Sequence, residues 1–218
     1  MRLPLILDLA AEHVPATLLR QQRLAKLVED RVLDIDLPRG RASFGEAIKA
    51  QVQIVGSITA AAQQFVWAWA ATDPVLPATV TRCVTDLRDY GQTHDIAELA
   101  EAAWHTDDVD PFLLAAIARG WCQSDAMYRT PAPGGAVYLL LDGLDLPPPE
   151  AHQVVQALTT GIALAPMDHR QATMALFGDN GFAVTGLDEM VVATVGQALV
   201  NVTFTGQGRI DDVSVSHL

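Results

Sequence analysis

Hydrophobic residues recur at intervals of three and four over residues 8–29, which predicts an amphipathic helix with Pro15 at a kink or an early break. The period then changes to two, because apolar and acidic residues alternate at 33–37 before a Pro-Arg-Gly turn at 38–40. The alternation returns further on, so we expect residues 32–70 to form about four antiparallel strands in a meander.

The middle of the chain returns to helical spacing. Apolar positions at 80–90 predict a helix, and Gly91 stands where a left-handed C-cap belongs. A capping-box pattern opens a second predicted helix over residues 95–104, and Asp110-Pro111 combines an N-cap with a proline at the first helical position of a third. We therefore expect three helices in succession here.

The remainder of the chain repeats the order of helix and meander. Residues 137–141 form an apolar run that predicts a buried strand, and 154–162 has helical spacing. Asp168 opens another predicted helix that ends at Asn180-Gly181. From residue 182 to the end the period is two again, which predicts a second meander.

These elements define an α+β fold with two antiparallel meander sheets, each preceded by a helix, and a helical middle section. The pattern leaves open whether the two sheets merge. No Ser/Gly linker or run of charges marks a boundary, so we expect residues 1–218 to form one compact unit. Lobes at 1–75 and 76–218 are the alternative division.

The charge balance excludes several classes of partner. Fourteen Lys and Arg against 26 Asp and Glu give a net charge of −12, whereas nucleic-acid backbones and anionic membranes require a basic face. No apolar run approaches the ~20 residues of a membrane span. Asp8 and Glu12 interrupt the apolar N-terminus before it resembles a secretory signal, which predicts a cytoplasmic protein.

The two cysteines, Cys83 and Cys122, lie in predicted helices and have no spacing typical of metal ligands or redox motifs. A free cysteine behaves as a small hydrophobic residue. We therefore expect two buried thiols in a reducing compartment, with a disulfide between them as the less favoured alternative.

Several short motifs resemble an uncharacterised family of bacterial proteins known only as a domain of unknown function. The motifs are Ile54-Val55-Gly56-Ser57 leading into Phe65-Val66-Trp67-Ala68-Trp69-Ala70, Tyr90-Gly91 with His94, Tyr128-Arg129-Thr130-Pro131 followed by Gly134-Gly135, and Val202-Thr203-Phe204 with Gly208-Arg209-Ile210. The family often has Asn after the W-x-W-A stretch, where this chain continues Ala71-Thr72-Asp73. The resemblance implies a fold but no activity.

The tryptophan segment offers a candidate binding surface. Phe65, Trp67 and Trp69 alternate with small residues, so one strand would place all three rings on one face. A layer of the core is the more economical interpretation of this face. The alternative is an aromatic wall for a flat ligand or for the side chain of a partner.

The segment 124–135 is a candidate anion-binding loop. Arg129, the hydroxyls nearby and the Gly134-Gly135 pair are groups that hold a carboxylate or phosphate. Alternatively, Asp125 and Arg129 form an ordinary i,i+4 ion pair at a helix end, and the glycines turn the chain into a strand. The sequence lacks the glycine-rich patterns of nucleotide sites.

Catalytic chemistry and metal binding lack a recognisable pattern. The six histidines are scattered without ligand spacing, and no nucleophile elbow is present, so we expect no metal, no cofactor and no catalytic set. His94 lies beside Asp95 and near Tyr90, which leaves open a histidine polarised by a carboxylate. An exposed histidine beside a capping aspartate is the simpler interpretation.

We therefore expect a non-catalytic binding or interaction module whose charge steers it toward a basic protein partner. The alternative is a small-ligand binder or enzyme, with Arg129 holding an anionic substrate and His94 or Asp125 acting as the base. The candidate ligand-binding residues are Trp67, Trp69, Tyr90, His94, Asp125, Tyr128, Arg129, Gly134 and Gly135. A homodimer through the tryptophan face or the terminal meander is compatible with either function.

Overall fold

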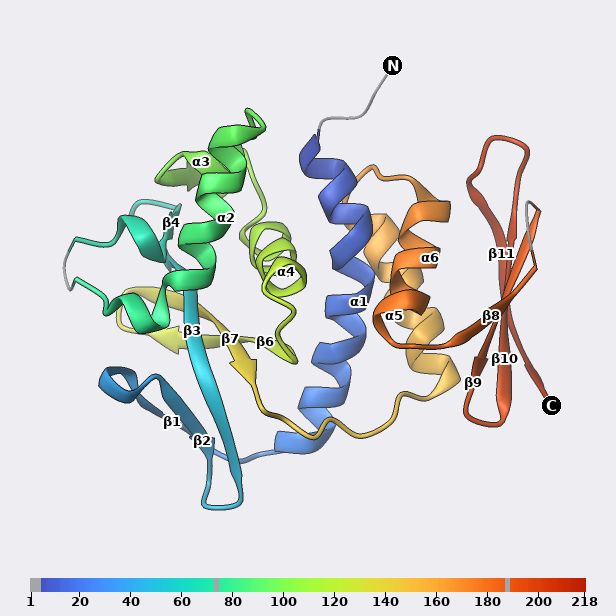
Figure 1. Ribbon diagram of the computed structural model, residues 1–218, viewed down its shortest axis with the longest axis horizontal. Helices are drawn as coiled ribbons and strands as arrows, with labels where there is room; N and C mark the ends of the chain where they lie inside the picture. Colours follow the sequence, from blue (N-terminus) through green and yellow to red (C-terminus); the bar gives the residue numbers. More distant parts are fainter. Residues whose placement is uncertain (1–4, 73–74, 187–188) are drawn as a thin grey trace. The chain divides into compact units, whose positions relative to one another are not determined.

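The computed structural model describes residues 5–72, 75–186 and 189–218, and within these ranges it confirms the α+β class (Figure 1). The chain divides into two compact units. Unit 1 combines Met1–Arg23 with Pro147–Leu218, and unit 2 is Leu24–Leu146. Each unit contains one antiparallel sheet, so the sheets do not merge among the described residues. These units differ from lobes at 1–75 and 76–218, because the N-terminal helix belongs to the same unit as the C-terminal segment. That both units form a single domain stays a prediction.

The sheet of unit 2 is built around one long strand. Its strands are β1 (Leu33–Asp36), β2 (Arg41–Phe44), β3 (Ile48–Thr59), β4 (Gln64–Trp67), β5 (Ala103–His105), β6 (Ala126–Ala132) and β7 (Gly135–Asp142). One edge of β3 pairs with β7 over most of its length, and β6 pairs with β7 beyond it. The other edge pairs first with β2, over residues 48–51, and later with β4, over residues 56–59. Residues 52–55 therefore have neither strand on that side.

Helices α2 (Arg82–Thr93) and α4 (Pro111–Trp121) contact β3 and each other. The side chain of Asp110 accepts a hydrogen bond from the N–H of Phe112, which confirms the predicted N-cap of α4. A short helix, α3 (Ala97–Ala100), and three 3-10 turns, η1 (Leu37–Arg39), η2 (Ala68–Ala70) and η3 (Ala78–Val80), complete the unit. The buried side chains between the helices and the sheet are mostly aliphatic.

Cys83 and Cys122 form a disulfide with Cα atoms 5.9 Å apart. Cys83 lies in the first turn of α2, and Cys122 follows the last residue of α4. The prediction of two free thiols is therefore wrong. The physical reason is tertiary, because packing of α2 against α4 brings together two cysteines that are 39 residues apart in the sequence.

Three predictions about local structure in unit 2 are also wrong. Gly91 does not cap α2 but lies buried within it, where a Cβ would meet Leu99 at 2.6 Å. The helix expected to reach Trp104 stops at Ala100, and Trp104 belongs to β5. Residues 126–132, expected as helix end and loop, form β6, because pairing with β7 satisfies their backbone.

Unit 1 combines three helices with a four-stranded sheet, and α5 packs against its strands β10 and β11. Its elements are α1 (Leu5–Val28, of which the part up to Arg23 belongs here), α5 (Ala151–Leu164), α6 (His169–Asp179), β8 (Ala183–Thr185), β9 (Met190–Val195), β10 (Ala198–Phe204) and β11 (Ile210–His217). The strands follow each other in antiparallel order, as expected for a meander. Their inward residues, such as Val200 and Val202, join the helices in one core. None of the helices in the described ranges is both long and apolar enough to cross a membrane.

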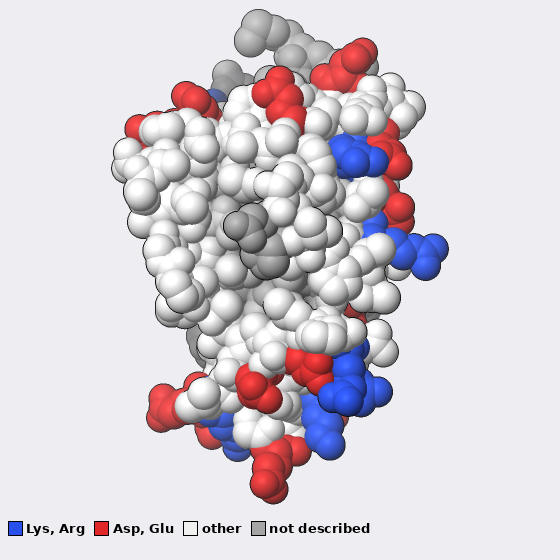
Figure 2. Space-filling model, turned by 90° about the vertical axis from the view of Figure 1, so that its left-hand side faces the viewer, with Lys and Arg blue, Asp and Glu red and all other residues white. Residues whose placement is uncertain are grey.

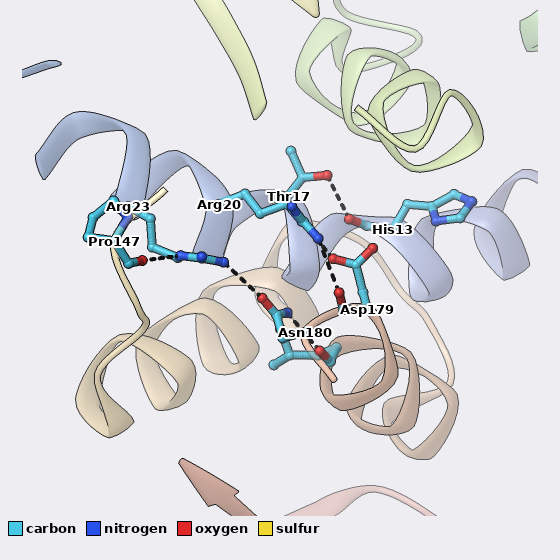
Figure 3. A network of polar contacts seen from close by, with 8 residues as sticks. His13, Thr17, Arg20, Arg23, Pro147, Asp179 and Asn180 are labelled. Atoms are coloured by element: carbon cyan, nitrogen blue, oxygen red, sulfur yellow. Dashed lines mark hydrogen bonds and ion pairs between the residues drawn. The ribbon is translucent and has the colours of Figure 1, made fainter. Parts of the chain in front are cut away.

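Polar contacts join α1 to the end of α6 within unit 1 (Figure 3). The Arg20 Nε donates to the Asp179 carboxylate at 2.7 Å, and its guanidinium also donates to the Asp179 carbonyl at 3.1 Å. Arg23 donates to the carbonyl of Pro147 and to the side chain of Asn180. Two guanidinium groups thus lie at the C-terminus of α6, where positive charge stabilises the helix dipole.

We expect the stability of unit 1 to fall in mild acid through His169. Its Nδ1 accepts a hydrogen bond from the N–H of Ile210 at 3.1 Å, which requires the neutral ring. Burial, together with the charge of Arg209, lowers the pKa of His169 below its usual value of 6.5. The unfolded chain therefore binds more protons below about pH 6.5, so acid favours unfolding. The loss should be about 0.5 kcal/mol, because the ring is only partly buried.

The measurement is the free energy of urea unfolding between pH 8 and pH 5. His169→Asn keeps an acceptor near the Nδ1 position but does not titrate, and should flatten this dependence. His152→Asn is the matched control, since the side chain of His152 is 70% exposed. If the free energy of unfolding depended on pH equally in wild type and in His169→Asn, the loss of stability in acid would not be due to His169.

Candidate functional site

A hollow of about 390 Å³ lies on one face of the unit 2 sheet. Its floor includes a row of paired residues that crosses four strands: Val66 on β4, Ser57 on β3, Val137 on β7 and Thr130 on β6. Paired residues point to the same side of a sheet, so these four side chains line up across the floor. Ile54 and Leu139, which also pair, extend the floor.

The walls of the hollow come from segments on both sides of the gap between β2 and β4. Ile35 and Leu37, from β1 and η1, line one side, whereas Ala68 and Leu76, in η2 and the segment after it, line the other. At the gap, the N–H of Val52 bonds to the carbonyl of Gly40 instead of to a strand. Ile54, which lies in this stretch of β3, lines the hollow.

The chemistry of the lining is uniform. Among the described residues, the side chains that line the hollow are aliphatic except for the hydroxyls of Ser57 and Thr130, and none is ionisable. In Figure 2, which shows the side on which β1 and β4 lie in Figure 1, most described side chains in the middle are uncharged, and charged groups lie toward the top, the bottom and the right. The described lining of the hollow is thus uncharged in a chain with a net charge of −12.

The tryptophan segment does not form one aromatic face. Trp67, on β4, is 1% exposed and donates its indole N–H to the carbonyl of Glu98 at 3.0 Å. It packs edge-on against Phe65 on the face opposite to Val66. Strand β4 ends at Trp67, so Trp69 lies in η2. Trp69 is partly exposed, and the guanidinium of Arg88 lies 5.3 Å from the centre of its ring. The expectation that one strand places Trp67 and Trp69 on the same face is wrong.

Tyr90 and His94 lie at the end of α2 and stack on each other, with ring centroids 4.0 Å apart. The ring of Trp121 lies 4.4 Å from Tyr90 on a neighbouring helix. His94 is exposed, and its Nδ1 is 2.9 Å from the carbonyl of Tyr90. Neither Tyr90 nor His94 lines the hollow.

Asp125 and Arg129 are not an i,i+4 ion pair on a helix. Asp125 precedes β6, and its carboxylate accepts hydrogen bonds from the N–H groups of Gly143 and Leu144 at 2.7 and 2.9 Å. Arg129 is exposed on β6 and points to the face opposite to Thr130, beside its pairing partner Tyr138. Burial raises the pKa of Tyr138, although the charge of Arg129 opposes the shift.

Tyr128 and the glycine pair lie nearer to the hollow without forming its floor. Tyr128 is half-buried and packs edge-on against Phe44. Gly134 adopts a φ of +77° in the turn between β6 and β7, and a Cβ on Gly135 would clash with the carbonyl of Ile58. These glycines thus shape the β6–β7 turn. The structure does not gather the nine candidate residues at one site, and their role in binding stays a prediction.

Sequence reasoning missed the residues that line the hollow. Val66, Val137 and Thr130 resemble ordinary strand residues, and only their register across β4, β3, β7 and β6 brings them together. One signal in the sequence could have indicated the hollow. Residues 137–141 are apolar on both faces of their strand, whereas the outer face of an antiparallel sheet is usually polar. Within the described ranges, no group of three His, Cys, Asp or Glu side chains has an arrangement that could hold a metal ion.

The fold and this face define an α+β protein whose antiparallel sheet has a hollow lined, among the described residues, by uncharged side chains. The chain belongs to the family of unknown function DUF6882, whose model matches residues 7–144. The match covers α1 through β7 and therefore every residue that lines the hollow. No curated protein and no solved structure matches the chain.

Proposed function

We propose that this protein is a non-catalytic binding module and that the hollow on the unit 2 sheet is its binding site. The observation that carries the proposal is a concavity of about 390 Å³ on the sheet of unit 2, whose described lining is almost entirely aliphatic. Sites for small molecules span roughly 300–1,000 Å³ and combine apolar walls with a few polar groups. Two hydroxyl groups in an aliphatic lining match that description.

The chemistry of the lining favours binding over catalysis. General acid–base catalysis requires a titratable group in contact with the reacting atoms. The described lining offers only the hydroxyls of Ser57 and Thr130, which need a neighbouring base to act as nucleophiles. A neutral site of this kind holds a ligand without activating it.

We expect the neutral fluorophore N-phenyl-1-naphthylamine to bind wild-type protein saturably at one site, with increased emission. Val137→Phe should weaken this binding at least tenfold, because the larger ring fills the centre of the floor. Val32→Phe is the matched control, since Val32 is 81% exposed and does not line the hollow. Circular dichroism confirms that each variant folds. Equal affinity in wild type and Val137→Phe, or no binding by wild type, would refute the proposal.

The net charge of −12 supports a second proposal, a basic protein as a macromolecular partner. Opposite charge accelerates association and is screened by salt. Affinity purification of the tagged protein from its host should retain one basic protein in stoichiometric amount at moderate salt and lose it at raised salt. A bait without such a partner at low salt would contradict this proposal. A homodimer also stays a prediction.

A further inference from the structure

We infer that the hollow selects an uncharged aliphatic molecule that carries a hydrogen-bonding oxygen, such as a long-chain alcohol. This inference rests on the proposed function and narrows it to a class of ligand. Three features of the hollow carry it: the absence of charge in the described lining, the aliphatic nature of the walls, and the position of the two hydroxyls.

Charge decides between ligands of equal chain length. An ionised carboxylate or ammonium group loses water when it enters an apolar site, and this loss is costly unless an opposite charge compensates for it. No described side chain that lines the hollow is ionisable. The nearest cation on β6, Arg129, points to the opposite face beside Tyr138. A fatty acid or an alkylamine therefore finds no counter-ion among the described residues of the lining.

The shape and lining of the hollow suit an extended methylene chain. The row from Val66 to Thr130 crosses four neighbouring strands and thus spans about 14 Å, similar to the length of an extended dodecyl chain. The described walls are formed by Ile, Leu, Val, Ala and Pro, so no aromatic ring is present in them to stack on a flat ligand. Aliphatic side chains instead bury a methylene chain along its length.

The two hydroxyls give the ligand an orientation. Ser57 and Thr130 lie on either side of Val137 in the same row, and each hydroxyl both donates and accepts. A single ligand oxygen reaches one of them while the chain covers Val137 or Val66. The Thr130 hydroxyl donates to the carbonyl of Pro131 at 3.5 Å and can still accept a hydrogen bond. A purely hydrocarbon ligand that covers the two hydroxyls offers them no such bond, which costs affinity.

The experiment is displacement of N-phenyl-1-naphthylamine at pH 7.4 by dodecan-1-ol, dodecanoate and dodecylammonium, each below its micelle or solubility limit. We expect dodecan-1-ol to displace the fluorophore at a concentration at least tenfold lower than either ion. The double variant Ser57→Ala/Thr130→Val should weaken dodecan-1-ol about tenfold, after each competition is corrected for that variant's own affinity for the fluorophore. Thr203→Val, on β10 of unit 1, controls for loss of a strand threonine.

The outcomes separate the two proposals. If the fluorophore binds at the hollow but dodecanoate or dodecylammonium competes as well as dodecan-1-ol, the inference about the ligand is wrong and the proposed function stands. The inference is equally overturned if the double variant binds dodecan-1-ol as tightly as wild type. If wild type does not bind the fluorophore, the proposed function itself fails.

Discussion

Replacing Trp67 by alanine should lower the free energy of unfolding by about 3–5 kcal/mol, the range for a fully buried aromatic side chain. Trp67 is 1% exposed, contacts Phe65, and bonds through its indole N–H to the carbonyl of Glu98. The substitution removes a large apolar surface from the core of unit 2 and leaves the Glu98 carbonyl without its partner. Urea unfolding followed by circular dichroism measures the change.

Two further variants separate packing from hydrogen bonding. Trp67→Phe keeps a ring but not the donor, so we expect an intermediate loss of about 1–3 kcal/mol. Trp69→Ala should cost less than Trp67→Ala, because Trp69 is partly exposed and no described residue accepts its indole N–H. If Trp69→Ala were as destabilising as Trp67→Ala, the structural distinction between the two tryptophans would be wrong.

The second large effect concerns the disulfide. The double variant Cys83→Ser/Cys122→Ser should lower the free energy of unfolding by about 3–4 kcal/mol, since the bond closes a loop with a sequence separation of 39 residues and thereby restricts the unfolded chain. The measurement is urea unfolding of wild type and variant without reductant. Wild type in excess reductant should unfold as the double variant does.

A thiol count provides the independent check on the disulfide. Denatured wild type, kept away from reductant, should contain no thiol that reacts with a chromogenic disulfide reagent, and two after reduction. Two reactive thiols before reduction would show that the bond does not form. Disulfides persist in oxidising compartments, so this bond weighs against the reducing cytoplasm, and the cytoplasmic location stays a prediction.

Local patterns predicted those parts of the fold that local interactions determine. The Pro38-Arg39-Gly40 turn is present because Gly40 adopts a φ of +59°, and Asp168 caps α6 by accepting from the N–H of Gln171. The terminal meander was likewise predicted from its period of two. These features depend on residues within a few positions of each other, so the sequence displays them directly.

Features that depend on distant residues were not predicted. Residues 126–132 pair with β7, and this pairing overrides a sequence that resembles a loop. Gly91 resembles a helix cap, yet it allows α2 to approach Leu99 closely. The residues of the hollow were not predicted for the same reason, because they are far apart in the sequence. Trp67 and Arg129 are candidates because of their own chemistry, whereas the register of four strands brings together the residues in the floor of the hollow.

The most direct test of the binding site is nuclear magnetic resonance of the isoleucine, leucine and valine methyl groups during titration with dodecan-1-ol. We expect saturable shifts at Ile54, Val66, Val137 and Leu139, with the methyl groups of Val200 and Val202 in the core of unit 1 unchanged. Saturable shifts confined to methyl groups outside the hollow, or no shifts at all, would contradict the assignment of this face as the binding site.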